Sequence, residues 1–202
     1  MKFSLILLLI PTLTFAKSIL PASFSAQYEN SWQSAIGGTK KEFGSIDYKY
    51  PSNVRLDVKS EPNLTLVTNK ATSWYYQPAF VKTEQAQVTV QKSSSHPVIK
   101  FLDSLKEGVE STKYFSSKEN GNDLVMTFNK EGQKEFSLTE VILHGTKPYK
   151  DVSGLKDIQS IELKDSNGKI KNLRFTDLKE GVTFPASHFI FNVPPKTKVI
   201  KG

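Results

Sequence analysis

Hydrophobic and polar residues alternate with a period of two along most of the chain, which is typical of β-strands with one buried and one wet face. Between residues 23 and 29, for example, Phe24, Ala26 and Tyr28 alternate with polar side chains. The alternation, with the turn residues that interrupt it, predicts strands over 23–29, 45–50, 54–58, 64–68, 73–76, 87–90, 123–128, 135–143, 158–164, 169–176 and 189–193. Asn120-Gly121 and residues 165–168 suit the tight turns of antiparallel hairpins.

Residues 98–105 have helical spacing instead. Their apolar side chains share one face of a helix, and these are Val98, Phe101, Leu102 and Leu105. Ser95 fits the N-cap and Gly108 the C-cap position. So many consecutive short strands imply a sheet that curls, and one amphipathic helix is available to cover it. We therefore predict a mostly β (α+β) fold: an unclosed, strongly curved antiparallel β-barrel with a helical lid over a hydrophobic cavity.

Residues 1–16 have the pattern of a signal peptide. Lys2 supplies a positive charge, residues 3–10 are apolar, and the segment ends in small residues at Ala16. The apolar run is too short to span a bilayer. We expect cleavage after Ala16, export of a soluble product, and a single domain over residues 17–202.

The chain has no cysteine. Thiol catalysis and thiolate metal sites are therefore excluded, and an exported protein without disulfides fits the periplasm of a Gram-negative bacterium better than eukaryotic secretion. The formal net charge of +7 favours acidic partners or anionic membrane surfaces. No basic run is interleaved with aromatic residues, so nucleic acid is not an expected partner.

Candidate chemistry is sparse. The histidines His96, His144 and His188 are scattered, with no spacing that would place two metal ligands on one face. The nucleophile elbow of serine hydrolases and the glycine-rich nucleotide loops are absent from the sequence. We expect no catalytic residue, no metal and no cofactor, and hence a binding protein and not an enzyme.

Several short motifs occur in a fixed order. They are FSAQ at 24–27, GSIDYKYP at 44–51, WYYQP at 74–78, IQSIELKDSNG at 158–168 and FIFNVPP at 189–195. Together with the signal peptide and the lack of cysteine, this ordered set resembles the LolA family, the periplasmic carriers of outer-membrane lipoproteins. The resemblance runs from about Phe24 to the C-terminus.

The resemblance implies a carrier whose cavity shields the acyl chains of lipoproteins between the two membranes. Its cargo would be acylated lipoproteins, its loading partner an inner-membrane lipoprotein-releasing ABC transporter, and its receiving partner an outer-membrane lipoprotein receptor. Each buried CH₂ is worth about 0.8 kcal/mol, so long acyl chains need such shielding to cross water. We expect a monomer that meets its partners through basic residues such as Lys49, Arg55 and Lys59.

The apolar faces of the predicted elements supply the candidates for an acyl-chain cavity. They are Ile46, Tyr48, Leu56, Val58, Trp74, Met126 and Phe128 from strands, and Phe101, Leu102 and Leu105 from the lid. Trp74 is the strongest single candidate. The alternative for each is permanent packing, because alternating apolar residues form the core by default, and roughly half of the set could do so.

Two features differ from the family pattern. Tyr50 stands where the family usually has an arginine tied to lid opening, and Arg55 lies nearby on the opposite strand parity. The family also usually begins with an amphipathic helix, whereas only residues 17–23, with Pro21 among them, precede the first strand here. Two other functions remain open: a periplasmic module of this fold that senses lipid or lipoprotein and regulates a partner, and, less favoured, a lipid-processing enzyme.

Overall fold

The computed structural model describes residues 17–81, 83–93 and 97–202. The expected signal peptide, the expected N-cap Ser95 and His96 lie outside the described residues. Within the described part of the chain, a single twelve-stranded sheet forms in the order β12-β6-β5-β4-β3-β2-β1-β11-β10-β9-β8-β7. All neighbours are antiparallel except β12 and β6, which run parallel.

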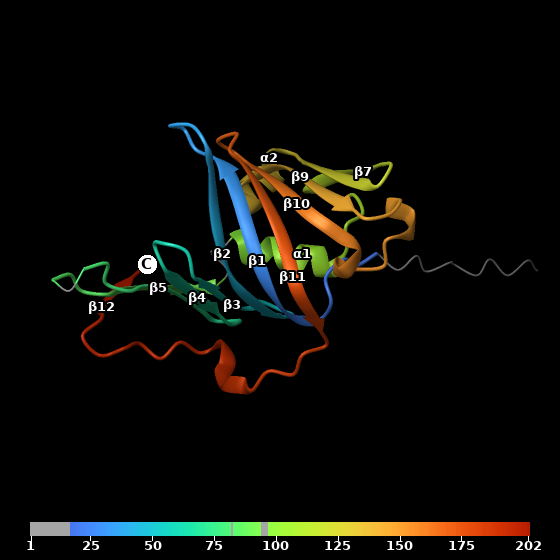
Figure 1. The fold of residues 1–202 in the computed structure, drawn as a ribbon. Coiled ribbons are helices and arrows are strands. Elements are labelled where there is room, and N and C mark those ends of the chain that lie inside the picture. The colour runs from blue at the N-terminus through green and yellow to red at the C-terminus, as the bar shows by residue number, and fades with distance from the viewer. Residues whose placement is uncertain (1–16, 82, 94–96) are drawn as a thin grey trace, which may run out of the picture.

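The strands are β1 (Ser23–Gln33), β2 (Thr39–Lys49), β3 (Asn53–Val58), β4 (Leu64–Thr68), β5 (Thr72–Gln77), β6 (Gln87–Lys92), β7 (Phe115–Asn120), β8 (Asp123–Phe128), β9 (Leu138–Gly145), β10 (Ile158–Asp165), β11 (Ile170–Glu180) and β12 (Lys198–Lys201). The sheet curls around helix α1 (Pro97–Glu107) without closing into a barrel (Figure 1). This confirms the predicted mostly β fold with a strongly curved, unclosed sheet and a helix over it.

The long central strands form because their apolar residues keep to one face. In β1, Phe24, Ala26 and Tyr28 are buried while their neighbours are not. Gly44 of β2 lies opposite Tyr28, and a Cβ at Gly44 would collide with the backbone of Asp57 and the ring of Tyr28. Glycine at this position therefore leaves room for the Tyr28 ring and for the backbone of β3.

Two helices cover the inner side of the sheet. Helix α1 ends as expected, because the amide of Gly108 donates to the carbonyl of Ser104. Helix α2 (Lys130–Phe136) was not predicted. It begins at Asn129, whose side chain accepts from the amide of Gly132, and it ends at Ser137 in the left-handed conformation.

Three sequence-based expectations need correction. The strand predicted over 135–143 begins only at Leu138, because Glu135 and Phe136 close helix α2. Residues 189–193 form no strand; a short 3-10 helix η4 (Ala186–Phe189) is followed by extended chain that reaches β12. The polar edge strand β7 was also missed. We call residues 182–201 the C-terminal strap; it passes β3 to β5 on the side away from α1 (Figure 1).

Residues 17–22 form no helix, in agreement with the short segment that the sequence leaves there. They nevertheless belong to the fold, because Ile19 and Leu20 are buried in the main core. The amide of Ile19 donates to the carbonyl of Leu105 at 3.2 Å. An extended segment thus lies against the end of α1.

Candidate functional site

The register of the strands divides the sheet into two faces. Residues directly opposite each other in an antiparallel ladder point to the same side. We call the side that carries Tyr48 the inner face; it lies under α1 and α2. Phe24 and Tyr48 stack there with ring centroids 5.4 Å apart, and both are fully buried. This end of the curled sheet is closed by packed side chains.

Most of the predicted cavity residues lie together under the lid. The main core cluster contains Ile46, Tyr48, Val58, Phe101, Leu102, Leu105, Met126 and Phe128, and Leu56 packs at its margin half-buried. Phe101 of α1 also contacts Phe128 and Phe136, with centroid distances of 6.2 and 6.3 Å. The lid thus rests on a packed aromatic interior, and the acyl-binding role of these residues stays a prediction.

Trp74 is placed on the other face. Tyr48 lies opposite Val54, Val54 opposite Thr68, and Thr68 opposite Ser73. Ser73 therefore points to the inner face, and its neighbour Trp74 points outward. Trp74 does not join the other candidates, and it cannot line a cavity beneath the lid.

The outer face around Trp74 is covered by the C-terminal strap. Phe189 of the strap is 4% exposed, and its carbonyl accepts from the side chain of Asn69. Phe191 lies 5.1 Å from Tyr76, a neighbour of Trp74 on the same face. His188 Nε2 is 2.7 Å from Asp47 Oδ2. The sheet is therefore packed on both sides in this half.

The inner face carries half-buried apolar side chains toward its open end. We call these residues the inner wall: Leu56, Leu64, Leu163 and Leu173, all packed against the main core without being fully buried. Leu173 lies opposite Asn30, whose side-chain oxygen is buried without a hydrogen-bond partner among the described residues. The wall thus offers apolar surface and one unused acceptor, and sequence periodicity had singled out only Leu56.

Helix α1 is tied to the β2–β3 turn by a set of hydrogen bonds that we call the lid junction. Asp103 of α1 accepts from the Tyr48 hydroxyl at 2.9 Å, from the Ser52 amide at 3.1 Å and from the Ser52 hydroxyl at 2.7 Å. Ser52 adopts a left-handed φ of 62°. The hydroxyl of Tyr50, the residue that differs from the arginine expected from the family resemblance, donates to Glu107 at 3.0 Å. The junction had no signal in the sequence beyond Tyr50.

The burial of tyrosines at this site perturbs their acidity. Burial, and secondly the carboxylate of Asp103, raises the pKa of Tyr48 far above its usual value. Burial, and secondly Glu42, does the same to the pKa of Tyr28. Both hydroxyls therefore stay protonated and donate to acidic side chains, which is a structural arrangement and supplies no base.

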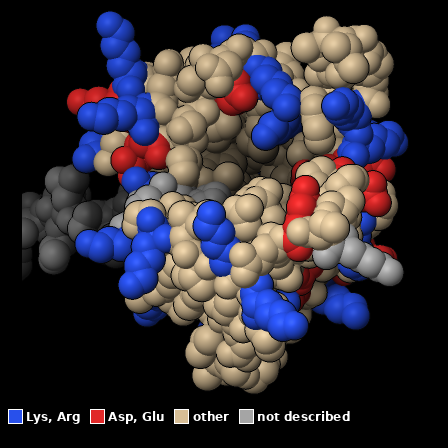
Figure 2. All heavy atoms as spheres, turned by 90° about the vertical axis from the view of Figure 1, so that its left-hand side faces the viewer, with Lys and Arg blue, Asp and Glu red and all other residues tan. Residues whose placement is uncertain are grey.

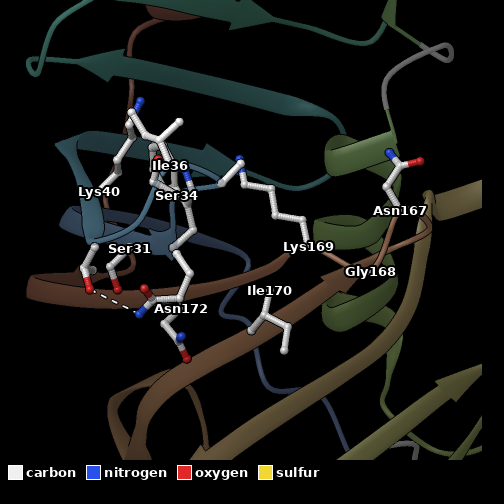
Figure 3. A pocket seen from close by; sticks show the side chains of 13 residues that line it. Ser31, Ser34, Ile36, Lys40, Asn167, Gly168, Lys169, Ile170 and Asn172 are labelled. Atoms are coloured by element: carbon white, nitrogen blue, oxygen red, sulfur yellow. Dashed lines mark hydrogen bonds between the residues drawn. The ribbon is translucent and has the colours of Figure 1, made fainter.

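A groove of about 910 Å³ opens between the β1–β2 and β10–β11 turns (Figure 3). Its walls include Trp32, Ile36 and Lys40 from the first hairpin and Lys169 and Ile170 from the second. Figure 3 shows the side chain of Lys169 extending toward the first hairpin. Figure 2 faces this open side of the molecule and shows a hollow with Lys and Arg side chains around it.

The basic residues expected to meet partners lie elsewhere. Arg55 pairs with Asp57 at 2.8 Å on the outer face, while Lys59 approaches Gln27 at 3.4 Å. Lys49 is exposed near the β2–β3 turn. The structure does not gather the three around the open end.

An open, curled antiparallel sheet with an apolar face under two helices defines the class of unclosed, lidded β-barrels. The family model described as outer membrane lipoprotein carrier protein LolA matches residues 21–192. The chain therefore belongs to the LolA family. A search of curated proteins found no match.

The chain is similar to several solved structures. A LolA superfamily protein from Nitrosomonas europaea is 12% identical, with 87% of this chain and 93% of that chain covered and a TM-score of 0.47. An uncharacterised conserved protein from Thermus thermophilus is 10% identical, with coverages of 91% and 92% and a TM-score of 0.50. A structure of MucB is 11% identical, with 92% of this chain but 62% of that chain covered and a TM-score of 0.44. At 10% identity, the likeness to the Thermus thermophilus protein shows the fold alone.

No helix in the described ranges is long and apolar enough to cross a membrane. The same ranges contain no group of three acidic or histidine side chains arranged to hold a metal ion. His144 lies 3.2 Å from Asp123, and His188 from Asp47 as described, so each of these histidines has one acidic neighbour.

Proposed function

We propose that this protein is a periplasmic carrier that binds the acyl chains of lipoproteins between the lid helices and the inner wall. The observation that supports this most directly is the inner wall itself, where half-buried leucines continue an apolar core toward an open end. Family membership supports the same cargo. Binding is the proposed activity, with no catalytic step.

Loading requires the lid to move, because the interior beneath it is already packed. Leu105 and Met126 are fully buried, so acyl chains enter this space when α1 separates from the sheet, and they then lie along the half-buried leucines. Methionine and leucine side chains repack at little cost when an apolar ligand arrives.

The proposed route follows from this cargo. An inner-membrane ABC transporter releases the lipoprotein, the carrier shields its acyl chains through the aqueous gap, and an outer-membrane receptor takes it. A loose apolar site suits this route, since cargo bound as tightly as a permanent core would not leave again.

The test is release of a triacylated lipoprotein from spheroplasts by the chain that begins at Lys17. We expect a soluble complex with the parent protein, and about tenfold less with Leu173→Gln, because an inner-wall side chain loses its apolar contact. Trp74→Gln is the matched control, since it removes more apolar surface from the opposite face and is expected to release as well as the parent.

Thermal unfolding establishes that each variant is folded before it is compared. Equal loss in Leu173→Gln and Trp74→Gln would contradict the placement of the site. If the folded parent releases no lipoprotein where a competent carrier does, the transport function is wrong and a lipoprotein-sensing role of the same fold takes its place.

A further inference from the structure

The most exposed large apolar side chains of the described residues lie at two chain reversals. Ile36, in the β1–β2 turn, is 91% exposed, and Phe80, in the β5–β6 loop, is 74% exposed, with Val81 beside it at 45%. In Figure 1 the β1–β2 turn reaches the upper left and the β5–β6 loop the far left, and Figure 2 views this side face on. Exposed apolar groups gathered on one side of a molecule indicate a surface that becomes covered.

Lysines surround the first of these tips. The segments 31–42 and 163–172 contain Lys40, Lys41, Lys164, Lys169 and Lys171, against the acidic residues Glu42 and Asp165. Asp165 is engaged within its own turn, where it accepts from the amides of Asn167 at 2.8 Å and Lys169 at 3.0 Å. Lys41 pairs with Glu29 at 3.0 Å. The two neighbouring turns therefore keep a positive balance.

An aromatic ring lies between the lysines and the sheet. The Lys169 ammonium is 4.6 Å from the centroid of the Trp32 ring, and both residues line the groove between the turns. Tryptophan favours the boundary between apolar chains and polar head groups. The surface is thus apolar at the tip of the turn, at Ile36, and becomes aromatic at Trp32 and positively charged at the lysines.

We propose that this side of the molecule docks on the surface of an anionic phospholipid bilayer. The docking face consists of residues 33–41, 78–81 and 164–171. Ile36 and Phe80 enter the head-group layer, while Lys40 and Lys169 lie against lipid phosphates. This goes beyond the proposed carrier function, because it requires no lipoprotein cargo and holds the open end of the sheet toward the membrane.

A bilayer suits the face better than a folded partner does. The apolar residues Ile36 and Phe80 stand on separate connections, and the face is hollowed, with Lys and Arg side chains around the hollow among a smaller number of acidic ones (Figure 2). Protein interfaces disfavour lysine. A fluid head-group layer can adapt its shape to such an uneven surface. Glu61 and Glu84 adjoin the β5–β6 loop, so that loop contributes apolar contact and the hairpin turns contribute the charge.

Co-sedimentation with lipid vesicles tests the proposal. The chain from Lys17 is used, because residues 1–16 have the pattern of a signal peptide and cleavage is expected after Ala16. We expect binding to vesicles of equal parts phosphatidylglycerol and phosphatidylcholine, little binding to phosphatidylcholine alone, and weakening with salt. The double variant Lys40→Glu/Lys169→Glu should bind about tenfold more weakly or worse. Ile36→Ser/Phe80→Ser should lose binding several-fold.

Matched control variants distinguish binding through this face from non-specific binding to vesicles. Lys118→Glu/Lys150→Glu makes the same charge change on exposed lysines of β7 and of the η2 turn (Tyr149–Asp151), and Ile190→Ser removes an exposed isoleucine from the strap. Both should bind vesicles as the parent does. So should Leu173→Gln, which distinguishes failure here from failure of the carrier function.

Absence of binding to the anionic vesicles would overturn the proposal, as would equal loss in the control and test variants. Self-association that Ile36→Ser abolishes, with no vesicle binding by the parent, would instead make this face an interface between two copies of the chain. Each folded variant is first compared with the parent by thermal unfolding.

Discussion

At the closed end of the sheet, individual hydrogen bonds connect the strands to the lid helix. Tyr48 is fully buried, and its hydroxyl has one described partner, the carboxylate of Asp103. The alternation of apolar and polar residues correctly placed Tyr48 on the inner face, because a period of two can be recognised from neighbouring residues alone. It could not reveal the acceptor, which comes from a helix 55 positions away in the chain.

The raised pKa of Tyr48 predicts a loss of stability in alkali. The pKa of an unfolded tyrosine is about 10, whereas in the folded state Tyr48 keeps its proton above that pH. The contribution is therefore complete below about pH 10 and is lost as pH rises toward the folded pKa. In urea unfolding, the free energy of the parent should fall with pH above this point, and Tyr48→Phe should show a shallower fall.

The comparison of slopes removes the effect of lysine titration, which parent and variant share. An identical alkaline slope in both proteins would show that Tyr48 does not contribute to this loss.

At the scale of elements, periodicity predicted most strands. It did not predict which face of a strand points inward when both faces carry apolar residues. In β5, Trp74 and Tyr76 occupy one face and Ser73 and Tyr75 the other, so both parities look partly apolar. The choice depends on the C-terminal strap, which covers the Trp74 side from a distant part of the chain. Helix α2 escaped prediction for a related reason: seven residues that include Gly132 carry little helical periodicity.

The lid helix depends on its junction with the β2–β3 turn. Asp103→Ala leaves the Tyr48 hydroxyl and the Ser52 amide without their acceptor, and should lower the free energy of unfolding by about 2 kcal/mol. Amides of α1 should also exchange faster with deuterium. Chemical unfolding and hydrogen exchange measure the two effects.

Glu84→Ala, in an exposed loop, is the control for loss of one carboxylate. A lid junction with no role in stability would leave Asp103→Ala as stable as Glu84→Ala. Ser52→Ala combined with Asp103→Ala should cost less than the sum of the single changes, because both remove the same contact.

The whole molecule is a sheet covered twice: the lid packs on its inner face and the strap on part of its outer face. The sequence indicated the first cover through the amphipathic spacing of residues 98–105. It did not indicate the second, because residues 189–193 alternate like a strand yet bury Phe189 and stack Phe191 without joining a ladder. Local pattern cannot distinguish extended chain on a sheet from extended chain within one.

Removal of the buried strap anchor should therefore destabilise the fold. Phe189→Ala is expected to cost about 3 kcal/mol, because Phe189 is 4% exposed on the outer face. Ile190→Ala is the neighbouring control, since Ile190 is 47% exposed and should change stability little. Calorimetric unfolding compares the two, and similar losses from both would contradict a specific anchoring role for Phe189.

An unclosed sheet also has two free margins, at β7 and β12. Rows of unpaired backbone amides and carbonyls there can template a strand from another molecule and start amyloid-like growth. Here the margins are guarded by charge: Lys118 and Glu119 on β7, and Lys198 and Lys201 at the two ends of β12, where they flank Val199 and Ile200. We expect these side chains to act as gatekeepers against fibril formation, because charge at an exposed edge opposes pairing with a strand of another molecule.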